Sequence, residues 1–227
     1  MERRSVLIAG LVSLVLFIVN TVSVFYGTTM SIDASLALWI NNFSLGVMDT
    51  QLMVFASQYG RELFWFLVLG VMILFGSRET RILGVELATL FGVGIVTGDL
   101  LKIIWFRPRP FDSASGVSGI VTRIVALDTD SSYPSGHALI VSIGAVFSLL
   151  KFSRKRVAGL LALEAGLVCY SRVYLGVHFP LDIIGGVLAG CTIVFLVTVL
   201  LETYADELGR MVDYALGKLL GGGWLRV

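Results

Sequence analysis

The chain has 227 residues, of which 56% are hydrophobic and only 15% are charged, and its formal net charge is +1. Soluble domains carry about 25% charged residues, so this composition predicts an integral membrane protein of a single domain. A net charge this close to zero leaves no basic footprint for nucleic acid and excludes nucleic acid as a partner. Cys169 and Cys191 lie in apolar runs without any zinc-type spacing, which favours buried, unpaired thiols over a disulfide or a metal site.

In chain order, six apolar stretches are candidates for membrane-spanning helices, each of which needs about 20 mostly apolar residues. To within a few residues they cover 5–26, 62–76, 82–105, 136–152, 156–173 and 181–202, and the second and fourth are short. The first stretch follows two arginines but lacks a small-residue cleavage pattern, so it predicts an uncleaved span. Residues 30–60 are too polar to span and predict a short amphipathic helix at the interface, and residues 203–223 predict an amphipathic surface helix.

The distribution of lysine and arginine predicts the orientation of these spans. With a cytoplasmic N-terminus, 11 of the 17 basic residues lie on the inner side, including the clusters at 78–81 and 151–156. This is the pattern of the positive-inside rule. The six basic residues that remain on the outer side therefore need another explanation; they are Arg61, Lys102, Arg107, Arg109, Arg123 and Arg172.

The first polar segment on the outer side is LKIIWFRPRP, residues 101–110, where the third stretch ends. Lys102 lies near the end of the predicted helix. Pro110 disfavours helix at Arg109, so Arg109 is predicted to lie in an extended loop. Taken alone, the segment is better explained by a lysine and an arginine that flank the membrane.

The second segment is YPSGH, residues 133–137, at the start of the fourth stretch. Ser135 is a typical N-cap, and Gly136 allows another group to approach the backbone closely. The N–H groups at a helix start form an anion site, and His137 projects from the first turn beside it. An ordinary helix cap with an incidental histidine would also explain this segment alone.

The third segment is SRVYLGVHFPLD, residues 171–182, between the last two stretches. Pro180 suits the first turn of the final helix and places Asp182 in that turn, from which its carboxylate can reach back to His178. A carboxylate on one imidazole nitrogen fixes the tautomer and leaves the other nitrogen free to attack. Taken alone, Asp182 could be a simple helix cap beside an interfacial histidine.

The predicted topology puts all three segments on the same side, and both histidines of the chain lie in them. Three cations, a helix start and two histidines together indicate a phosphate site with a nucleophile and an acid. The pattern K-x6-RP, PSGH and SR-x5-H-x3-D resembles the signature of the type 2 phosphatidic acid phosphatase family, and the six-span plan is similar to its membrane branch. The motifs cover about 80 residues and match without a gap or substitution.

The resemblance implies a role for each matching residue. Lys102, Arg109 and Arg172 would hold the phosphoryl oxygens with Ser135 and the Gly136 N–H. His178 would be the nucleophile that forms a phosphohistidine, Asp182 would orient it, and His137 would protonate the leaving oxygen and then activate water. Three fixed cations can supply the charge neutralisation that phosphoryl transfer needs, and no carboxylate cluster suits Mg²⁺, so we expect a metal-independent enzyme without a cofactor.

Glu86, Asp99 and Glu164 lie within predicted spans, where ionisable groups usually mark function or pairing. Asp99 is placed to pair with Lys102. We assign no catalytic role to Glu86 or Glu164.

We therefore expect an all-α, polytopic membrane bundle of six transmembrane helices, with the active site at its non-cytoplasmic end. The expected substrate is a lipid phosphate or pyrophosphate, of the polyprenyl, phosphatidic acid or phosphatidylglycerophosphate type. A phosphatase of soluble esters, similar to glucose-6-phosphatase, is the alternative within enzymes, and a vanadate haloperoxidase fits a small membrane chain poorly. A lipid-binding or transport protein is the alternative outside them, although no motif histidine is missing.

Overall fold

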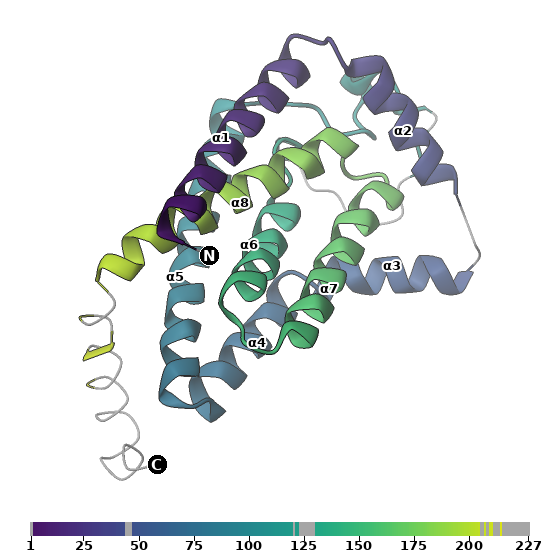
Figure 1. Cartoon of the computed structure of the whole chain (residues 1–227). Coiled ribbons are helices and arrows are strands. Elements are labelled where there is room, and N and C mark those ends of the chain that lie inside the picture. The colour runs from purple at the N-terminus through teal and green to yellow at the C-terminus, as the bar shows by residue number, and fades with distance from the viewer. Residues whose placement is uncertain are drawn as a thin grey trace.

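The computed structural model describes residues 2–43, 47–119, 121–122 and 130–204, together with Glu207, Gly209, Arg210 and Tyr214. Arg123 and most of the predicted tail helix lie outside the described residues. Within them the protein is a bundle of helices without β-strands (Figure 1). The helices are α1 (Arg3–Phe25), α2 (Met30–Asn42), α3 (Val47–Tyr59), α4 (Glu62–Phe75), α5 (Arg78–Ile104), α6 (Gly136–Lys151), α7 (Lys155–Tyr174) and α8 (Pro180–Thr203), with a short 3-10 helix, η1 (Ser113–Ser115), between α5 and α6.

A helix lies at each of the six apolar stretches, with bounds within four residues of the predicted ones. By length and composition, α1, α5, α7 and α8 can each cross a membrane, and α3 and α4 pass the same test only as a pair bent by 57°. The helix α6 is apolar but shorter. The sequence predicted one amphipathic helix before α4, whereas the structure has two, α2 and α3, and α3 leads into α4 across the bend.

The helix α6 lies in the middle of the bundle, packed against α5, α7 and α8 (Figure 1). Leu139, Val141, Ile143 and Phe147 on α6 are at most 1% exposed. Its 16 residues span about 24 Å, less than the roughly 30 Å of a bilayer core. At its N-terminus Ser135 and Ala138 are fully buried, so the free N–H groups there need partners from the protein or from a ligand.

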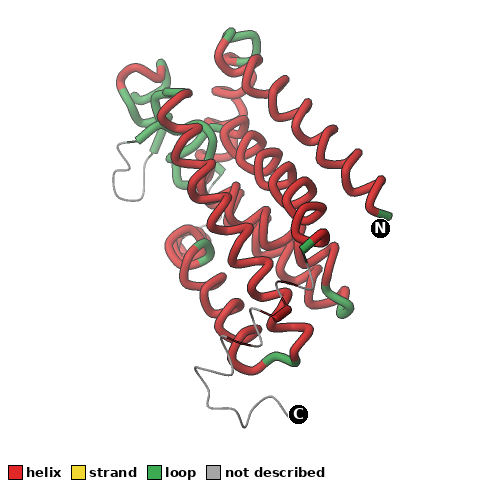
Figure 2. Tube along the Cα trace, turned by 90° about the vertical axis from the view of Figure 1, so that its left-hand side faces the viewer, coloured by secondary structure: helices red, strands yellow, loops and turns green. Residues whose placement is uncertain are grey.

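The larger loops gather at one end of the bundle, here called the site end (Figure 2). It contains the loop from α5 to α6 and the link from α7 to α8, while the turns at Arg78 and Arg154 lie at the opposite end. The helix α1 packs along α8 and reaches the site end with its last turns. There Asn20 Nδ2 donates to the Tyr133 hydroxyl at 3.1 Å and to the Leu181 carbonyl at 3.2 Å, and the Thr21 hydroxyl lies 2.6 Å from that of Tyr133.

Candidate active site

Backbone hydrogen bonds join the three polar segments at the site end. The Ser132 N–H donates to the Arg107 carbonyl at 2.9 Å, and the Ser135 N–H donates to the Asp182 carbonyl at 3.0 Å. The first bond ties the loop after α5 to the loop before α6, and the second ties the start of α6 to the first turn of α8. Residues that are far apart in the sequence are thereby held in one place.

Lys102, Arg109 and Arg172 come to this place from the last turn of α5, the loop after it and the last turn of α7. Arg109 is 2% exposed and Arg172 is 5% exposed. Arg109 Nη1 donates to the Val177 carbonyl at 3.1 Å, and Arg172 Nη1 donates to Ser57 Oγ at 2.6 Å. These bonds give two guanidinium charges fixed positions, and a guanidinium keeps its charge when it is buried.

Asp130 joins two of these cations. Its carboxylate forms ion pairs with Lys102 Nζ and Arg109 Nη2, and its carbonyl accepts from Arg109 Nε at 3.1 Å. Partial burial opposes ionisation, but the hydrogen bonds and charges of Lys102 and Arg109 outweigh it and lower the pKa of Asp130 to about 2. The sequence predicts Asp99 as the partner of Lys102, so this pairing is a correction. The two oxygens of the Asp130 carboxylate contact the two cations, as the oxygens of a phosphoryl group would.

The start of α6 has the predicted cap. Ser135 is fully buried and its Oγ accepts a hydrogen bond of 3.4 Å from the Ala138 N–H. The helix α8 approaches so closely that a Cβ added to Gly186 would lie 2.5 Å from the Ser135 carbonyl oxygen. Only glycine fits at this position of α8 without moving the turn that leads into Gly136.

His178 is enclosed between Arg109 and Asp182. It is 1% exposed, with Nε2 3.4 Å from Arg109 Nη1 and Nδ1 3.5 Å from Asp182 Oδ2. The second distance is longer than a normal hydrogen bond. Burial, together with the positive charges of Arg109, Arg172 and Lys102, lowers the pKa of His178 well below its ordinary value. The ring is therefore neutral at pH 7, and Nε2 faces the cations with a lone pair when Nδ1 carries the proton.

Asp182 has partners besides His178 that the sequence reasoning missed. Its Oδ2 accepts from the Phe179 N–H at 2.8 Å, and its Oδ1 accepts from Arg107 Nη1 at 2.6 Å. Arg107 Nη2 also donates to Asp33 Oδ2 at 2.6 Å, and the guanidinium carbon lies 4.2 Å from the centre of the Phe179 ring. Asp33, on α2, accepts in turn from the Leu181 N–H at 2.9 Å. Both carboxylates are at most 1% exposed, so two buried acids share the single positive charge of Arg107.

His137 lies on the first turn of α6, apart from this network. Its Nδ1 is 3.4 Å from Arg61 Nη1, and the Nη2 of Arg61 pairs with the Glu62 carboxylate. The outer cations thus fall into three groups among the described residues. Lys102, Arg109 and Arg172 place their charges around His178, Arg107 bonds to Asp182, and Arg61 lies beside His137.

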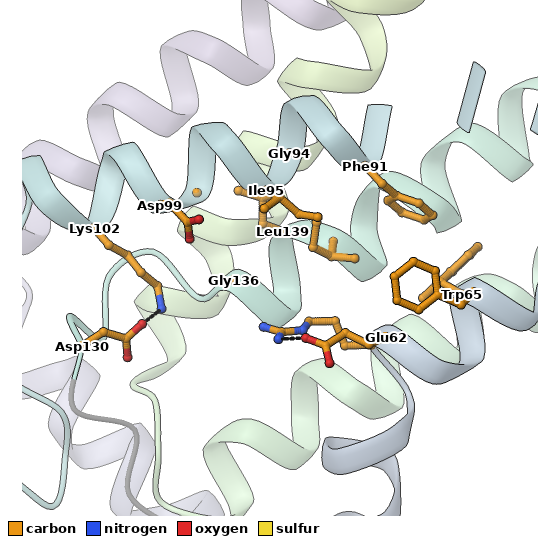
Figure 3. A pocket seen from close by; sticks show the side chains of 14 residues that line it. Glu62, Trp65, Phe91, Gly94, Ile95, Asp99, Lys102, Asp130, Gly136 and Leu139 are labelled. Atoms are coloured by element: carbon orange, nitrogen blue, oxygen red, sulfur yellow. Dashed lines mark hydrogen bonds and ion pairs between the residues drawn. The ribbon is translucent and has the colours of Figure 1, made fainter. Parts of the chain in front are cut away.

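A pocket of about 390 Å³ opens between α4, α5 and α6. At one end it is lined by Lys102, Asp130 and Gly136, and toward the other by Trp65, Phe91 and other apolar side chains (Figure 3). Lys102 and Glu62 approach Gly136 from opposite sides in this view. No group of three or more His, Cys, Asp or Glu side chains within the described part of the chain is arranged to hold a metal ion. The pocket therefore combines a charged end with a hydrocarbon-like end.

The sequence profile of the PAP2 superfamily, the type 2 phosphatidic acid phosphatases, matches residues 83–205. The chain belongs to this family. It is 46% identical over 145 residues to an undecaprenyl-diphosphatase of Sulfolobus acidocaldarius. The matched residues cover 64% of this chain and 67% of the relative. It is 29% identical over 180 residues to the undecaprenyl-diphosphatase BcrC of Bacillus subtilis, covering 76% and 86% of the two chains.

The fold of this PAP2 protein is also that of a solved membrane phosphatase. A PAP2-type phosphatidylglycerolphosphate phosphatase from Bacillus subtilis superposes with a TM-score of 0.69, covering 86% of this chain and 96% of the other, at 23% sequence identity. The resemblance predicted from the motifs is thus confirmed, and so is the prediction of a membrane lipid phosphatase. The matched segment contains all eight residues that the motifs single out, and their individual roles remain proposals.

Proposed function

We propose that this PAP2 phosphatase hydrolyses a polyprenyl diphosphate to a polyprenyl monophosphate and inorganic phosphate. The pocket carries the proposal, because its cations suit a phosphate headgroup and its aromatic and aliphatic lining suits the adjoining hydrocarbon chain. The 46% identical relative, itself named an undecaprenyl-diphosphatase, supports a polyprenyl diphosphate over phosphatidic acid or phosphatidylglycerophosphate. A soluble phosphate ester has no group that would fill the apolar end.

In the proposed reaction the terminal phosphoryl group displaces the Asp130 carboxylate from Lys102 and Arg109. Arg172, Ser135 and the Gly136 N–H complete the site. Phosphoryl transfer depends mainly on positioning and on neutralising the charge of the three equatorial oxygens. The fixed guanidinium groups do both without reorganising, which favours the transition state and requires no metal ion.

The neutral Nε2 of His178 then attacks phosphorus, and the bond from phosphorus to the leaving oxygen breaks. Asp182 accepts a hydrogen bond from Nδ1–H and stabilises the positive charge that forms on the ring. His137 gives a proton to the leaving oxygen, then removes one from the water that hydrolyses the phosphohistidine. Inorganic phosphate is released and both histidines return to their starting states.

We further propose that the chain is a single membrane-embedded domain with six spans, a cytoplasmic N-terminus and the site end facing the non-cytoplasmic side. The exposed arginines at the opposite end of the bundle, Arg3, Arg4, Arg154 and Arg156, support this orientation through the positive-inside rule. The span count follows if α3 and α4 act as one broken span and α6 as a short enclosed one.

The function is tested by phosphate release from purified protein with polyprenyl diphosphate, phosphatidic acid, phosphatidylglycerophosphate and glucose 6-phosphate, each in the presence of EDTA. We expect the highest kcat/KM for the polyprenyl diphosphate, inhibition by vanadate, and a phosphate label on His178 after rapid quenching. Glucose 6-phosphate as the best substrate would favour the soluble-ester alternative. Recovery of a chelated enzyme only with Mg²⁺ would overturn the metal-independent mechanism.

The orientation is tested with single cysteines in a chain whose Cys169 and Cys191 are replaced by alanine. Ser113 in η1 and Ser153 between α6 and α7 are both exposed and lie at opposite ends of the bundle. A membrane-impermeant thiol reagent should label Ser113→Cys in intact cells and Ser153→Cys only after permeabilisation. The reverse pattern would place the site in the cytoplasm.

A further inference from the structure

Arg61 is an outer cation that none of the three motifs includes. It lies at the break between α3 and α4, where the two helices bend by 57°. Its Nη1 is 3.4 Å from His137 Nδ1 and 3.7 Å from the position that a Cβ on Gly136 would take. Arg61 and its ion-pair partner Glu62 both line the pocket. A positive charge is therefore held at the start of α6, beside the proposed general acid.

Two arginines at the site end contact different histidines, Arg109 the proposed nucleophile and Arg61 the proposed acid. Arg109 lies 3.4 Å from the proposed attacking atom, His178 Nε2, and shares Asp130 with Lys102. Arg61 instead lies beside His137, the group that serves the leaving oxygen. In Figure 3, Lys102 and Glu62, the ion-pair partner of Arg61, lie on opposite sides of Gly136. Because the attacking and leaving atoms are roughly in line across phosphorus, Arg61 belongs to the leaving-group side.

Monophosphate and diphosphate lipids place different groups on that side. A monophosphate leaves an alkoxide, which needs a proton and carries no further charge. A diphosphate leaves a lipid monophosphate, which carries about 1.5–2 negative charges at pH 7. A proton donor is sufficient for the first group, whereas the second also requires a cation where its charge develops.

We propose that Arg61 binds the lipid-linked phosphate of a diphosphate substrate and so sets the preference for diphosphate over monophosphate lipids. This rests on the proposed function of the same site. As His178 Nε2 bonds to the terminal phosphorus, the bond to the bridging oxygen breaks, and its electron pair remains on the lipid phosphate held by Arg61. Water then releases the terminal group as inorganic phosphate. The Glu62 side chain, 62% exposed, turns into solvent when the phosphate takes its place.

The pair with Glu62 is a weaker explanation of the position of Arg61. A solvent-exposed ion pair contributes little to stability, and neither partner would need to lie near His137 for it to form. A second possibility is that Arg61 acts only through His137. Removal of Arg61 would then affect monophosphate turnover at least as much, because the alkoxide depends most on the proton that His137 donates. The two roles predict opposite changes in substrate preference.

The test compares Arg61→Gln and Arg61→Lys with wild type on a polyprenyl diphosphate and the monophosphate of the same chain. Arg3→Gln is the matched control, since Arg3 is exposed at the opposite end and bonds only to Thr203 Oγ1 at 3.0 Å among the described residues. We expect the ratio of kcat/KM for diphosphate to that for monophosphate to fall about ten- to hundredfold in Arg61→Gln, the scale of a charge-assisted hydrogen bond. Arg61→Lys should recover part of the ratio, and Arg3→Gln should leave it unchanged.

A binding measurement separates recognition from chemistry. Inhibition by methylenediphosphonate, a diphosphate that cannot be hydrolysed, should weaken in Arg61→Gln more than inhibition by inorganic phosphate does. An unchanged ratio of kcat/KM, or a larger loss with the monophosphate, would overturn the assignment of Arg61. If wild type hydrolyses neither lipid, the proposed function itself fails. If it hydrolyses the diphosphate and Arg61→Gln keeps the wild-type preference, only the assignment of Arg61 fails.

Discussion

The two ends of the bundle carry the same type of side chain in opposite settings. At the site end, Arg109 and Arg172 are at most 5% exposed and bonded to protein groups, and the side chain of Arg107 is 12% exposed between two carboxylates. At the opposite end, Arg154 and Arg156 are exposed. A charge that orients the chain in the membrane needs only to be on the correct side, whereas a charge that holds a substrate needs a fixed position.

The same contrast applies to ion pairs. Lys151 Nζ lies 2.7 Å from Glu202 Oε1 at the opposite end, with the two side chains 21% and 42% exposed. Such surface pairs contribute about 0–1 kcal/mol to stability. Arg107 makes two contacts of 2.6 Å with Asp33 and Asp182, both without exposed side-chain surface. Removing one partner of a buried pair typically costs about 3–5 kcal/mol, because the remaining charge is left uncompensated.

The largest effect is expected at His178, the proposed nucleophile of the site end. His178→Gln should lower kcat on the order of 10⁴-fold or more, since it removes the side chain that is proposed to form the covalent intermediate. The measurement is phosphate release beside rapid-quench labelling, with Arg154→Gln at the opposite end as the control. A second variant, His137→Ala, can be tested with p-nitrophenyl phosphate, whose leaving group needs no proton. His178 should still become labelled in this variant, but release of phosphate should be slow because His137 no longer activates water. Wild-type labelling of His178→Gln would refute the assignment.

The next largest effect is expected for Asp182→Asn. Asparagine keeps the size of the side chain but loses the charge that stabilises the imidazolium, and its amide favours the wrong tautomer of His178. Loss of the equivalent carboxylate in a serine-protease triad lowers kcat about 10⁴-fold, and we expect a loss approaching that scale. The vanadate inhibition constant should change much less, because Lys102, Arg109 and Arg172 remain. A parallel loss of vanadate binding would indicate that Asp182 mainly holds the architecture.

A direct comparison of the two ends comes from Arg107→Met and Lys151→Met. We expect Arg107→Met to lower the free energy of unfolding by about 3–5 kcal/mol and Lys151→Met by less than about 1 kcal/mol. Both values can be measured by titrating SDS into mixed micelles. Asp33→Asn should lower the free energy of unfolding by less than Arg107→Met does, because Arg107 keeps its ion pair with Asp182. Equal costs for Arg107→Met and Lys151→Met would show that burial does not distinguish the two ends.

The smallest effect is expected for Asp130→Asn. In the proposed mechanism the Asp130 carboxylate competes with phosphate for Lys102 and Arg109, so its removal should tighten vanadate inhibition about two- to fivefold. The lowered pKa of about 2 means that the ion pairs are present above the unfolded-state pKa, near 4, and are lost only as the pH falls toward 2. The ratio of the vanadate inhibition constants of wild type and Asp130→Asn should therefore be constant between pH 5 and pH 9. Weaker vanadate binding would show that Asp130 helps to build the site.

The sequence predicts the local features of the fold and of the site, but not the contacts between residues that are distant in the chain. Hydropathy and short motifs are local features of the chain, so the sequence alone is sufficient to locate the six helices and the eight motif residues. The partners Asp33, Asp130 and Arg61 depend on distances across the fold, and no spacing rule connects them to the motifs. The break between α3 and α4 was missed because the polar residues before it lowered the hydropathy of the segment. Arg107 had a signal, since it remained an unexplained outer cation.

The hydrogen bonds from α1 to the site end mean that α1 cannot be exchanged for an arbitrary hydrophobic helix. Tyr133 precedes the turn that leads into α6, and its hydroxyl bonds to Asn20 and Thr21 of α1. Asn20 also bonds to the Leu181 carbonyl, next to Asp182. A chimaera that replaces α1 with an unrelated hydrophobic anchor would still enter the membrane but would lose these supports. A transplantable first helix must therefore carry an asparagine and a threonine one turn from its outer end.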